Sequence, residues 1–335
     1  MALTVNSKPS GFRAIGGGEL IYQFTEASVT GKSNYRVEIE LNGISAPIFE
    51  YRPNSSLVIE ADIAPILRSA LELNFTTASR FGSTYVKYQA KWDGGSDAQV
   101  PLSGDVIYYY CGVNHALNKR TRFHIGSDGG NFLIPTSKLY AWKNRTAYVD
   151  FLHDNTMNAT TTVEYYYSGG STVLGTFDGT TIGMTSLSFT PVADGVIRVY
   201  YSSTVYKEIS VKILPECANP IYLKWINDLG GISTWLFSFN QAWTLAAQSM
   251  WKDNTYRVET NVLTLDQWKM LQELNREGIE YGSNSKSGAY VIDFTDEAYT
   301  VPVYPMPEDA NTMTKMNKHS FALDLRYEQI PYILL

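Results

Sequence analysis

Residues 35–43, Tyr-Arg-Val-Glu-Ile-Glu-Leu-Asn-Gly, are the stretch that indicates the fold class most clearly. Apolar and charged side chains alternate strictly over residues 35–41, so an extended strand here has one apolar and one charged face. Asn42 and Gly43 tolerate the positive φ angles of a tight hairpin turn. This stretch therefore predicts a half-buried strand that turns back on itself.

Similar short strands recur along most of the chain. The sequence contains 24 Tyr, 44% hydrophobic residues and 18% charged residues. Aromatic and β-branched side chains favour the pleated, half-buried surface of a sheet. The other strong strand patterns are residues 85–92, 163–167, 196–201, 208–213, 289–294 and 321–327. We therefore predict a mainly β protein.

Changes in pattern along the chain predict three domains. Residues 1–105 combine strands with one helix, capped by Asp62, and indicate a sandwich-like domain. Residues 106–215 show many short strands between polar turns and no helical periodicity, which is typical of an Ig-like β-sandwich. Residues 216–335 are richer in aromatics and mix strands with a helix. The expected architecture is tandem β-sandwich (Ig-like) modules followed by an α+β C-terminal domain.

The helix of the third segment has clear start and stop signals. Thr264 and Gln267 have the spacing of a capping box, and Gly278 follows the helix. Apolar side chains recur at helical spacing on one face, namely Leu265, Trp268, Leu271 and Leu274. These residues predict an amphipathic helix packed on a core.

Charge and composition exclude several kinds of partner and compartment. The formal net charge of -6 provides no basic field for nucleic acid or an anionic membrane surface. No run approaches the ~18 apolar residues of a membrane span, and the first residues lack the pattern of a signal peptide. Cys111 and Cys217 are too few for a disulfide scaffold, and their spacing leaves open whether they meet. We expect no nucleic acid partner, no membrane insertion, and residence in the cytoplasm where the chain is made.

Catalytic and cofactor motifs are missing from the sequence. It contains neither a phosphate-binding glycine loop nor a G-x-S-x-G nucleophile turn. Cys111, His115 and His124 offer sulfur and nitrogen to zinc, but no fourth ligand lies nearby. Asp293 with Asp296 and Glu297 could supply the acid and base of a glycosidase, although scattered surface carboxylates explain them equally well. We predict a protein that is not an enzyme and binds no cofactor or metal.

Two tyrosine triplets and the apolar C-terminus are candidates for intermolecular contact. Tyr109 and Tyr166 are the middle residues of residues 108–110 and 165–167, so each faces away from its neighbours in a strand. They could stack on sugars, form a subunit interface or cover the edge of a core. The C-terminal residues would be awkward in free solution, so we expect them to dock within the subunit or on a neighbour. They are Tyr332, Ile333, Leu334 and Leu335.

Residues 216–237 form the most distinctive stretch, with the spacing C-x-N-P, L-x-W, N-x-L-G-G and W-L-F. Gly230 and Gly231 predict a turn. The aromatic side chains around them would supply a large core able to join two domains. The principal members of this structural aromatic motif are Tyr222, Trp225, Trp235 and Phe237.

This stretch resembles a family of tail- and baseplate-associated virion proteins from bacteriophages and prophages of Bacteroidetes-type bacteria. Residues 62–68 and the pattern from Val262 to the closing strand at 321–327 are also similar to that family. The resemblance implies a structural component of a phage tail or baseplate that assembles as a ring or trimer with itself and with other tail proteins. It implies a location in the virion after assembly in the host cytoplasm. The alternative is a receptor-binding or glycan-binding adhesin module of a virion, with a host surface glycan as partner.

Overall fold

The computed structural model divides into two compact units, one formed by Met1–Ile125 with Tyr281–Asn284 and one by Gly126–Glu280 with Ser285–Leu335. The described residues are 4–9, 12–15, 20–25, 36–41, 49–70, 77–91, 101–112, 130–153, 160–201, 204–217, 220–239, 254–275, 289–292, 300–306, 314–315 and 318–327. Strands far outnumber helices among them, which confirms the prediction of a mainly β protein.

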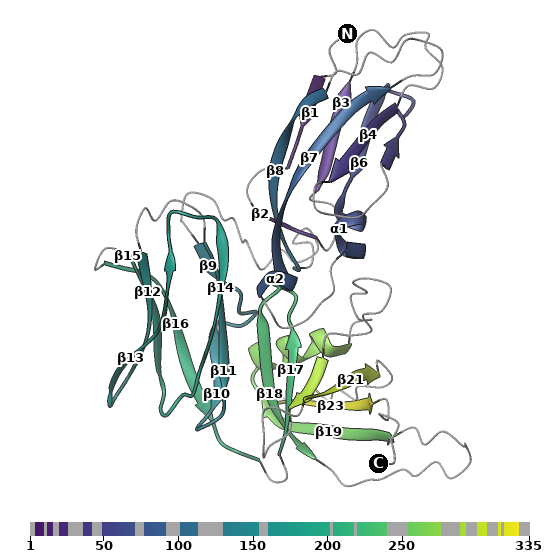
Figure 1. The fold of residues 1–335 in the computed structure, drawn as a ribbon. Coiled ribbons are helices and arrows are strands. Elements are labelled where there is room, and N and C mark those ends of the chain that lie inside the picture. Colours follow the sequence, from purple (N-terminus) through teal and green to yellow (C-terminus); the bar gives the residue numbers. More distant parts are fainter. Residues whose placement is uncertain are drawn as a thin grey trace, which may run out of the picture. The chain divides into compact units, whose positions relative to one another are not determined.

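The first unit contains two sheets that face one another (Figure 1). The three-stranded sheet has the order β1 (Thr4–Ser7), β3 (Ile21–Thr25), β6 (Val58–Asp62). The five-stranded sheet has the order β2 (Phe12–Ala14), β8 (Pro101–Tyr110), β7 (Phe81–Lys91), β4 (Arg36–Leu41), β5 (Phe49–Tyr51). Two short helices, α1 (Ala64–Ala70) and α2 (Thr77–Arg80), connect β6 to β7.

Both sheets contribute to the core of this unit. Val37, Ile39 and Leu41 of β4 are buried, as their alternation with charged residues predicted. From the other sheet, the ring of Phe24 packs on that of Tyr88 of β7 at 5.1 Å between centroids. Asp62 begins α1 as expected, because its Oδ1 accepts a hydrogen bond of 3.0 Å from the backbone N–H of Ala64.

The first domain ends later than residue 105, because that position lies inside β8. Residues on both sides of it pair with β7, from Pro101 opposite Gln89 to Tyr110 opposite Phe81. The backbone N–H of Cys111 still donates to the carbonyl of Arg80 at 2.9 Å. A continuous strand ladder cannot be divided between two domains, so residues 106–112 belong to the first unit.

The second unit begins with another two-sheet sandwich. Its three-stranded sheet has the order β14 (Gly183–Phe189), β11 (Ala147–His153), β9 (Gly130–Phe132). Its five-stranded sheet has the order β10 (Lys138–Trp142), β16 (Thr204–Leu214), β15 (Gly195–Tyr201), β12 (Thr160–Tyr167), β13 (Gly170–Asp178). Side chains from all eight strands share one core, which includes Phe151, Val163, Ile197 and Val211.

The two sandwiches have the same strand order. Counting strands from the start of each, both have a three-stranded sheet of the first, third and sixth strands. Both also have a five-stranded sheet in the order second, eighth, seventh, fourth, fifth, with the second and eighth strands parallel. One β topology therefore occurs twice in the chain.

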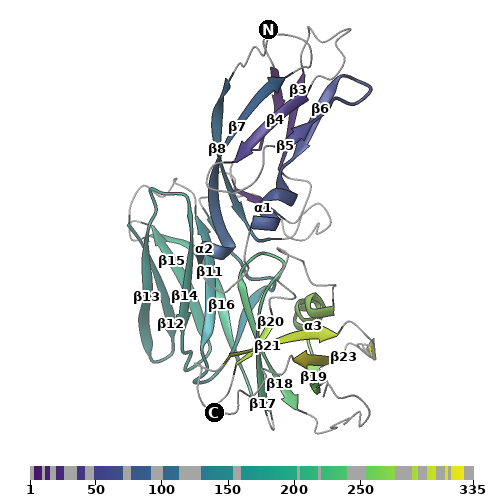
Figure 2. The same cartoon turned by 45° about the vertical axis from the view of Figure 1, so that its right-hand side comes forward.

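The remaining strands of the second unit form a sheet that closes on itself. Its order is β19 (Asn254–Leu263), β18 (Ile232–Phe239), β17 (Pro220–Ile226), β20 (Ala289–Ile292), β21 (Thr300–Met306), β23 (Lys318–Tyr327), with β22 (Thr314–Lys315) beside β23. Pairing of β19 with β23 completes the ring of six strands. Figure 2 shows α3 (Leu265–Leu271) beside these strands, and the 3-10 helix η2 (Gln272–Asn275) continues it.

Helix α3 begins with the predicted capping box. Thr264 Oγ1 accepts from the backbone N–H of Gln267, and Gln267 Oε1 accepts from the backbone N–H of Thr264 at 2.8 Å. Leu271 and Leu274 are buried, whereas Leu265 at the start of the expected apolar face is 49% exposed. The buried face is rotated towards Gln267 and Met270, because those positions meet the core.

Candidate functional site

The aromatic motif lies at a junction inside the second unit. Tyr222, Trp225, Trp235 and Phe237 are all buried in one cluster. This cluster also contains Tyr140 and Trp142 of sandwich strand β10 and residues of α3 and η2. The rings of Trp142 and Trp235 meet edge to face at 5.1 Å between centroids. The sandwich and the closed sheet therefore share a core, as a single compact unit requires.

The turn between β17 and β18 is bound by its own side chain and by the sandwich. Asn227 Oδ1 accepts from the backbone N–H groups of Leu229 at 2.9 Å and Gly231 at 3.1 Å. Asn227 Nδ2 donates to the carbonyl of Leu133, which lies between β9 and β10, at 3.0 Å. Gly231 packs so closely that a Cβ there would lie 2.2 Å from the Leu133 oxygen. The N-x-L-G-G spacing thus encodes a buried turn docked on the sandwich.

Two carboxylates complete the junction. Asp150 of β11 is 1% exposed, and its Oδ2 accepts from the backbone N–H of Ile232 at 2.5 Å. Asp266 of α3 accepts from both the backbone N–H and the hydroxyl of Ser137, at 3.0 and 2.9 Å. Charged acceptors make hydrogen bonds roughly twice as strong as neutral ones. These bonds fix the sandwich relative to the closed sheet at both ends of the junction.

The candidate contact residue Tyr166 lies on the outer face of the second sandwich, in a cluster of aromatic and charged groups. Arg198 Cζ is 4.9 Å from the centroid of the Tyr166 ring, and Tyr200 meets that ring edge to face at 6.0 Å. Arg198 Nε is 3.3 Å from Glu208 Oε2. The strand register places Glu164, Arg198 and Glu208 directly opposite one another. We call these five residues, Glu164, Tyr166, Arg198, Tyr200 and Glu208, the outer cluster.

Hydrogen bonding organises the outer cluster. The Tyr166 hydroxyl donates to Glu164, and this bond, followed by the bond with Tyr200, raises the pKa of Tyr166 above its ordinary value. Tyr166 therefore stays protonated, and the cluster presents neutral rings between fixed charges. Tyrosine and arginine are the residue types enriched at the energetic centres of protein interfaces. The outer cluster is thus a candidate contact surface whose side chains are held by bonds to one another.

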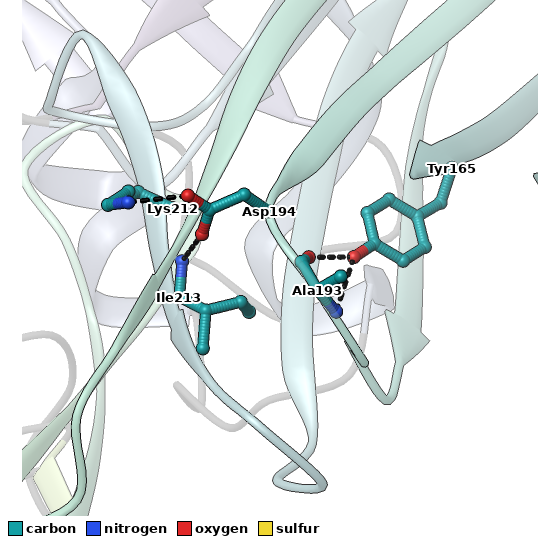
Figure 3. A network of polar contacts seen from close by, with 5 residues as sticks. All are labelled: Tyr165, Ala193, Asp194, Lys212 and Ile213. Atoms are coloured by element: carbon teal, nitrogen blue, oxygen red, sulfur yellow. Dashed lines mark hydrogen bonds and ion pairs between the residues drawn. The ribbon is translucent and has the colours of Figure 1, made fainter. Parts of the chain in front are cut away.

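Tyr165 points to the opposite face of β12, and its hydroxyl binds the connection between β14 and β15 (Figure 3). Its hydroxyl donates to the carbonyl of Ala193 and lies 3.4 Å from the Ala193 amide. Next to Ala193, Asp194 accepts from the backbone N–H of Ile213 at 2.8 Å and pairs with Lys212. Burial raises the pKa of Tyr165. This network holds the β14–β15 connection against β12 and β16.

Tyr109, the other candidate contact residue, faces away from the exposed side of its sheet. Its ring lies over Gly82, where a Cβ would be 2.7 Å from the tyrosine Cζ. The neighbouring Tyr108 takes the exposed side, and its ring stacks on Phe81 at 6.4 Å between centroids. On that side Tyr85 and Val106 pair with each other and are 37% and 54% exposed. The exposed apolar residues of this sheet, Tyr85 and Val106, therefore lie on the face of Tyr108 and not on that of Tyr109.

Several sequence-predicted residues fall outside the described ranges. These are the C-terminal group Tyr332, Ile333, Leu334 and Leu335, the histidines His115 and His124, and the carboxylates Asp293 and Asp296. Cys111 and Cys217 are not joined by a disulfide. No group of three potential ligands suited to a metal ion occurs among the described residues. In the same part of the chain, no helix has the length and apolar character to cross a membrane.

Sequence reasoning missed Asp150, Asn227 and Arg198. Asp150 and Ile232 are 82 residues apart, so no local pattern links them. Asn227 carried a signal, since Asn followed by a glycine pair is typical of a side chain that bonds its own turn. Arg198 could have been paired with Glu208 only once the register of β15 and β16 was known.

No protein-family model and no curated protein matches the chain. Among solved structures, it is similar to the polymeric Ig receptor ectodomain of a teleost fish, with 7% identity and a TM-score of 0.24 over 64% of this chain and 100% of that chain. A chain from the structure of Dpr2 Ig1-Ig2 in complex with DIP-Theta Ig1-Ig3 shows 10% identity and a TM-score of 0.21, over 98% of this chain and 90% of that chain. TM-scores this low carry no argument. The architecture therefore rests on the strand order of the chain itself.

Proposed function

We propose that this chain is a structural component of a bacteriophage tail or baseplate and acts by subunit–subunit assembly, not by catalysis. The observation that carries the proposal is the placement of residues 216–237, on which the resemblance rests. In this structure they form the junction that joins a sandwich to the closed sheet, with Asn227 and Gly231 at its centre. A segment used in this way suits a protein whose task is to hold surfaces at fixed positions.

A rigid body is advantageous for assembly because less conformational freedom is lost when subunits associate. The junction combines a shared aromatic core with hydrogen bonds from Asp150, Asn227 and Asp266. Its conspicuous polar groups are thus engaged in structural contacts. This use of the carboxylates favours a scaffold over a catalytic centre.

The repeated strand order supports tandem Ig-like modules within this scaffold. Ig sandwiches of the variable type extend the sheet of strands G, F and C by strand C′. In both sandwiches the eighth, seventh, fourth and fifth strands occur side by side in that order. The closed sheet and α3 correspond to the α+β C-terminal domain of this proposal. Such modules are common carriers of surface contacts.

The partners that follow from the proposal are further copies of the chain and other tail proteins. Closed rings or trimers arise when each copy presents complementary surfaces at a fixed angle. The location would be the virion, after assembly in the host cytoplasm. No nucleic acid, membrane or cofactor enters the proposal.

The test is the solution mass of the purified chain, measured by light scattering at several concentrations, with negative-stain electron microscopy of the same samples. A discrete oligomer with ring or trimer symmetry supports the proposal. A chain that stays monomeric at every concentration, alone and with candidate tail proteins, contradicts it.

A glycan-binding adhesin is the second candidate function, favoured by the outer cluster. Tyr166 and Tyr200 offer rings, and the carboxylates of Glu164 and Glu208 beside them offer acceptors for hydroxyl groups. A glycan array separates the two functions. Binding that is lost in Tyr166→Ala, by a chain that forms no oligomer, would favour the adhesin.

A further inference from the structure

Strand β13 leaves an edge of the second sandwich open. It is nine residues long and lies at the border of the five-stranded sheet, where β12 is its one partner among the described strands. Residues 170–173 are all exposed, and Val173 is 57% exposed. An open edge presents unpaired backbone N–H and C=O groups that can pair with another strand. Long edges with so few charged residues are unusual in proteins that remain monomeric.

The other described edges of the second unit are closed, covered or short. The ring of six strands has no edge where β19 meets β23. At the opposite side of the sandwich, Tyr140 and Trp142 of β10 pack on Trp235 of the closed sheet. Strand β9 has three residues. Leu187 of β14 lies against Gly175 of β13, so the two sheets meet at that corner.

The first sandwich shows how the equivalent edge is protected. Its fifth strand, β5, has three residues and carries Glu50. Arg36 of the adjacent strand is 3.1 Å from Glu50 and 3.7 Å from Glu38. Short length and charge are two devices by which proteins prevent edge pairing. Strand β13 occupies the same topological position, but it is nine residues long and its single charged residue, Asp178, lies at its far end.

The shape of β13 confines the open part to its first half. A register irregularity opposite Val163 and Glu164 leaves Leu174 as an extra residue, which is a β-bulge. Beyond the bulge, Phe177 is buried in the core and Gly175 contacts β14. Residues 171–173 are therefore held in an extended conformation by an anchored strand, and Gly170, with a φ of +142°, begins that strand at the hairpin turn.

The distribution of charge around β13 favours a second copy of the chain as the partner of this edge. The chain carries a net charge of -6, so two copies repel one another over most approaches. No charged residue occurs between Glu164 and Asp178. The hairpin they enclose is composed of Tyr, Ser, Gly, Thr and other neutral residues, a composition well suited to contact. At this edge two copies can meet without like-charge repulsion.

We propose that residues 170–173 pair antiparallel with the same residues of a second copy across a two-fold axis, which joins two five-stranded sheets into one. The two Glu164 residues would then be at least three strand spacings apart, about 14 Å or more. Their repulsion is largely screened at that distance, because the Debye length is about 8 Å at physiological ionic strength. The inference rests on the proposed assembly function and names one of its contacts, the one that would join two trimers or two rings face to face, since a trimer alone contains no two-fold axis.

The experiment measures the light-scattering mass of the wild type and of four variants. Val173→Lys places a charge on the edge, and Ser171→Lys does so two residues away. Val173→Thr retains a β-branched side chain without charge. Val106→Lys is the matched control, because Val106 is a similarly exposed valine on a strand of the first sandwich. Circular dichroism and thermal unfolding show that each variant is folded.

We expect the two lysine variants at the edge to lower the mass at least two-fold, while Val173→Thr and Val106→Lys retain the wild-type mass. If the wild type assembles and both Val173→Lys and Ser171→Lys retain its mass, the edge pairing is overturned and the assembly function stands. If only Val106→Lys lowers the mass, the edge pairing is overturned, and the contact between copies lies on the first sandwich instead. A monomeric wild type overturns both proposals.

Discussion

The buried carboxylate of Asp150 on β11 accepts a hydrogen bond of 2.5 Å from the backbone N–H of Ile232, the first residue of β18. This contact crosses from the second sandwich to the closed sheet. The backbone carbonyl of Asp150 also accepts from Leu133 at 2.9 Å, beside the turn that Asn227 holds. Asp150 therefore binds the closed sheet through its side chain and the sandwich through its backbone carbonyl.

Asp150→Ala is expected to destabilise the second unit. The Ile232 amide would lose its acceptor, and a buried donor left without a partner costs about 1–3 kcal/mol. Urea denaturation followed by tryptophan fluorescence measures this, because Trp142, Trp225 and Trp235 all lie in the junction cluster. Asp150→Asn is the control and should lose less, since its amide oxygen still accepts. Equal stability of Asp150→Ala and wild type would contradict the assigned role.

Gly231→Ala is expected to open the junction. The new methyl group would lie 2.2 Å from the backbone oxygen of Leu133, which cannot move without disturbing β9 and β10. We expect a loss of about 2–3 kcal/mol in the free energy of unfolding, the upper part of the range for overpacking. Gly169→Ala is the matched control, because the nearest atom there belongs to the half-exposed ring of Tyr167, which can turn. Similar losses in both variants would refute the interpretation.

Tyr165→Phe should remove the pin between β12 and the β14–β15 connection. Deleting the hydroxyl leaves the Ala193 carbonyl without this donor, and the expected loss is about 1 kcal/mol. Hydrogen exchange should rise locally in the peptide that contains Ala193 and Asp194. Tyr85→Phe, on the exposed face of the first sandwich, serves as the reference and should leave exchange unchanged. Unaltered exchange at Ala193 in Tyr165→Phe would show that the bond is dispensable.

The first unit should lose stability at alkaline pH through Tyr51. Burial, followed by the charge of Asp62, raises the pKa of Tyr51 from 10.0 to about 12. The folded state therefore favours the protonated tyrosine, and its contribution is complete below pH 10 and falls as the pH rises towards 12. Thermal unfolding by circular dichroism should show the difference between wild type and Tyr51→Phe shrinking over that interval. A constant difference from pH 8 to 11 would exclude this linkage.

Local periodicity was sufficient for the strands and the helix cap. The alternation at Val37, Ile39 and Leu41 predicted their burial, and the spacing of Thr264 and Gln267 predicted the cap of α3. Both features depend on residues close in sequence, where backbone geometry fixes which side chains share a face. The aromatic character of residues 216–237 likewise indicated a core, and all four motif residues are buried.

Tertiary register could not be predicted in the same way. Alternation states that Tyr108 and Tyr109 face opposite sides, but only the pairing of β8 with β7 decides which side is exposed. The boundary near residue 105 was misplaced for a related reason, since a strand ladder continues through it. Closure of the last sheet likewise depends on a long-range pairing, between β19 and β23, that no short motif encodes.

The position of β23 in the closed sheet has a consequence for synthesis on the ribosome. Strands β17, β18 and β19 are translated well before β23, yet both β19 and β21 need β23 as a neighbour. A nascent chain that has not yet released residues 318–327 would hold two unpaired strand edges, which are targets for chaperones and sites of misassociation. Ring closure therefore waits for the synthesis of residues 318–327, and chains that end before them would expose the edges of β19 and β21.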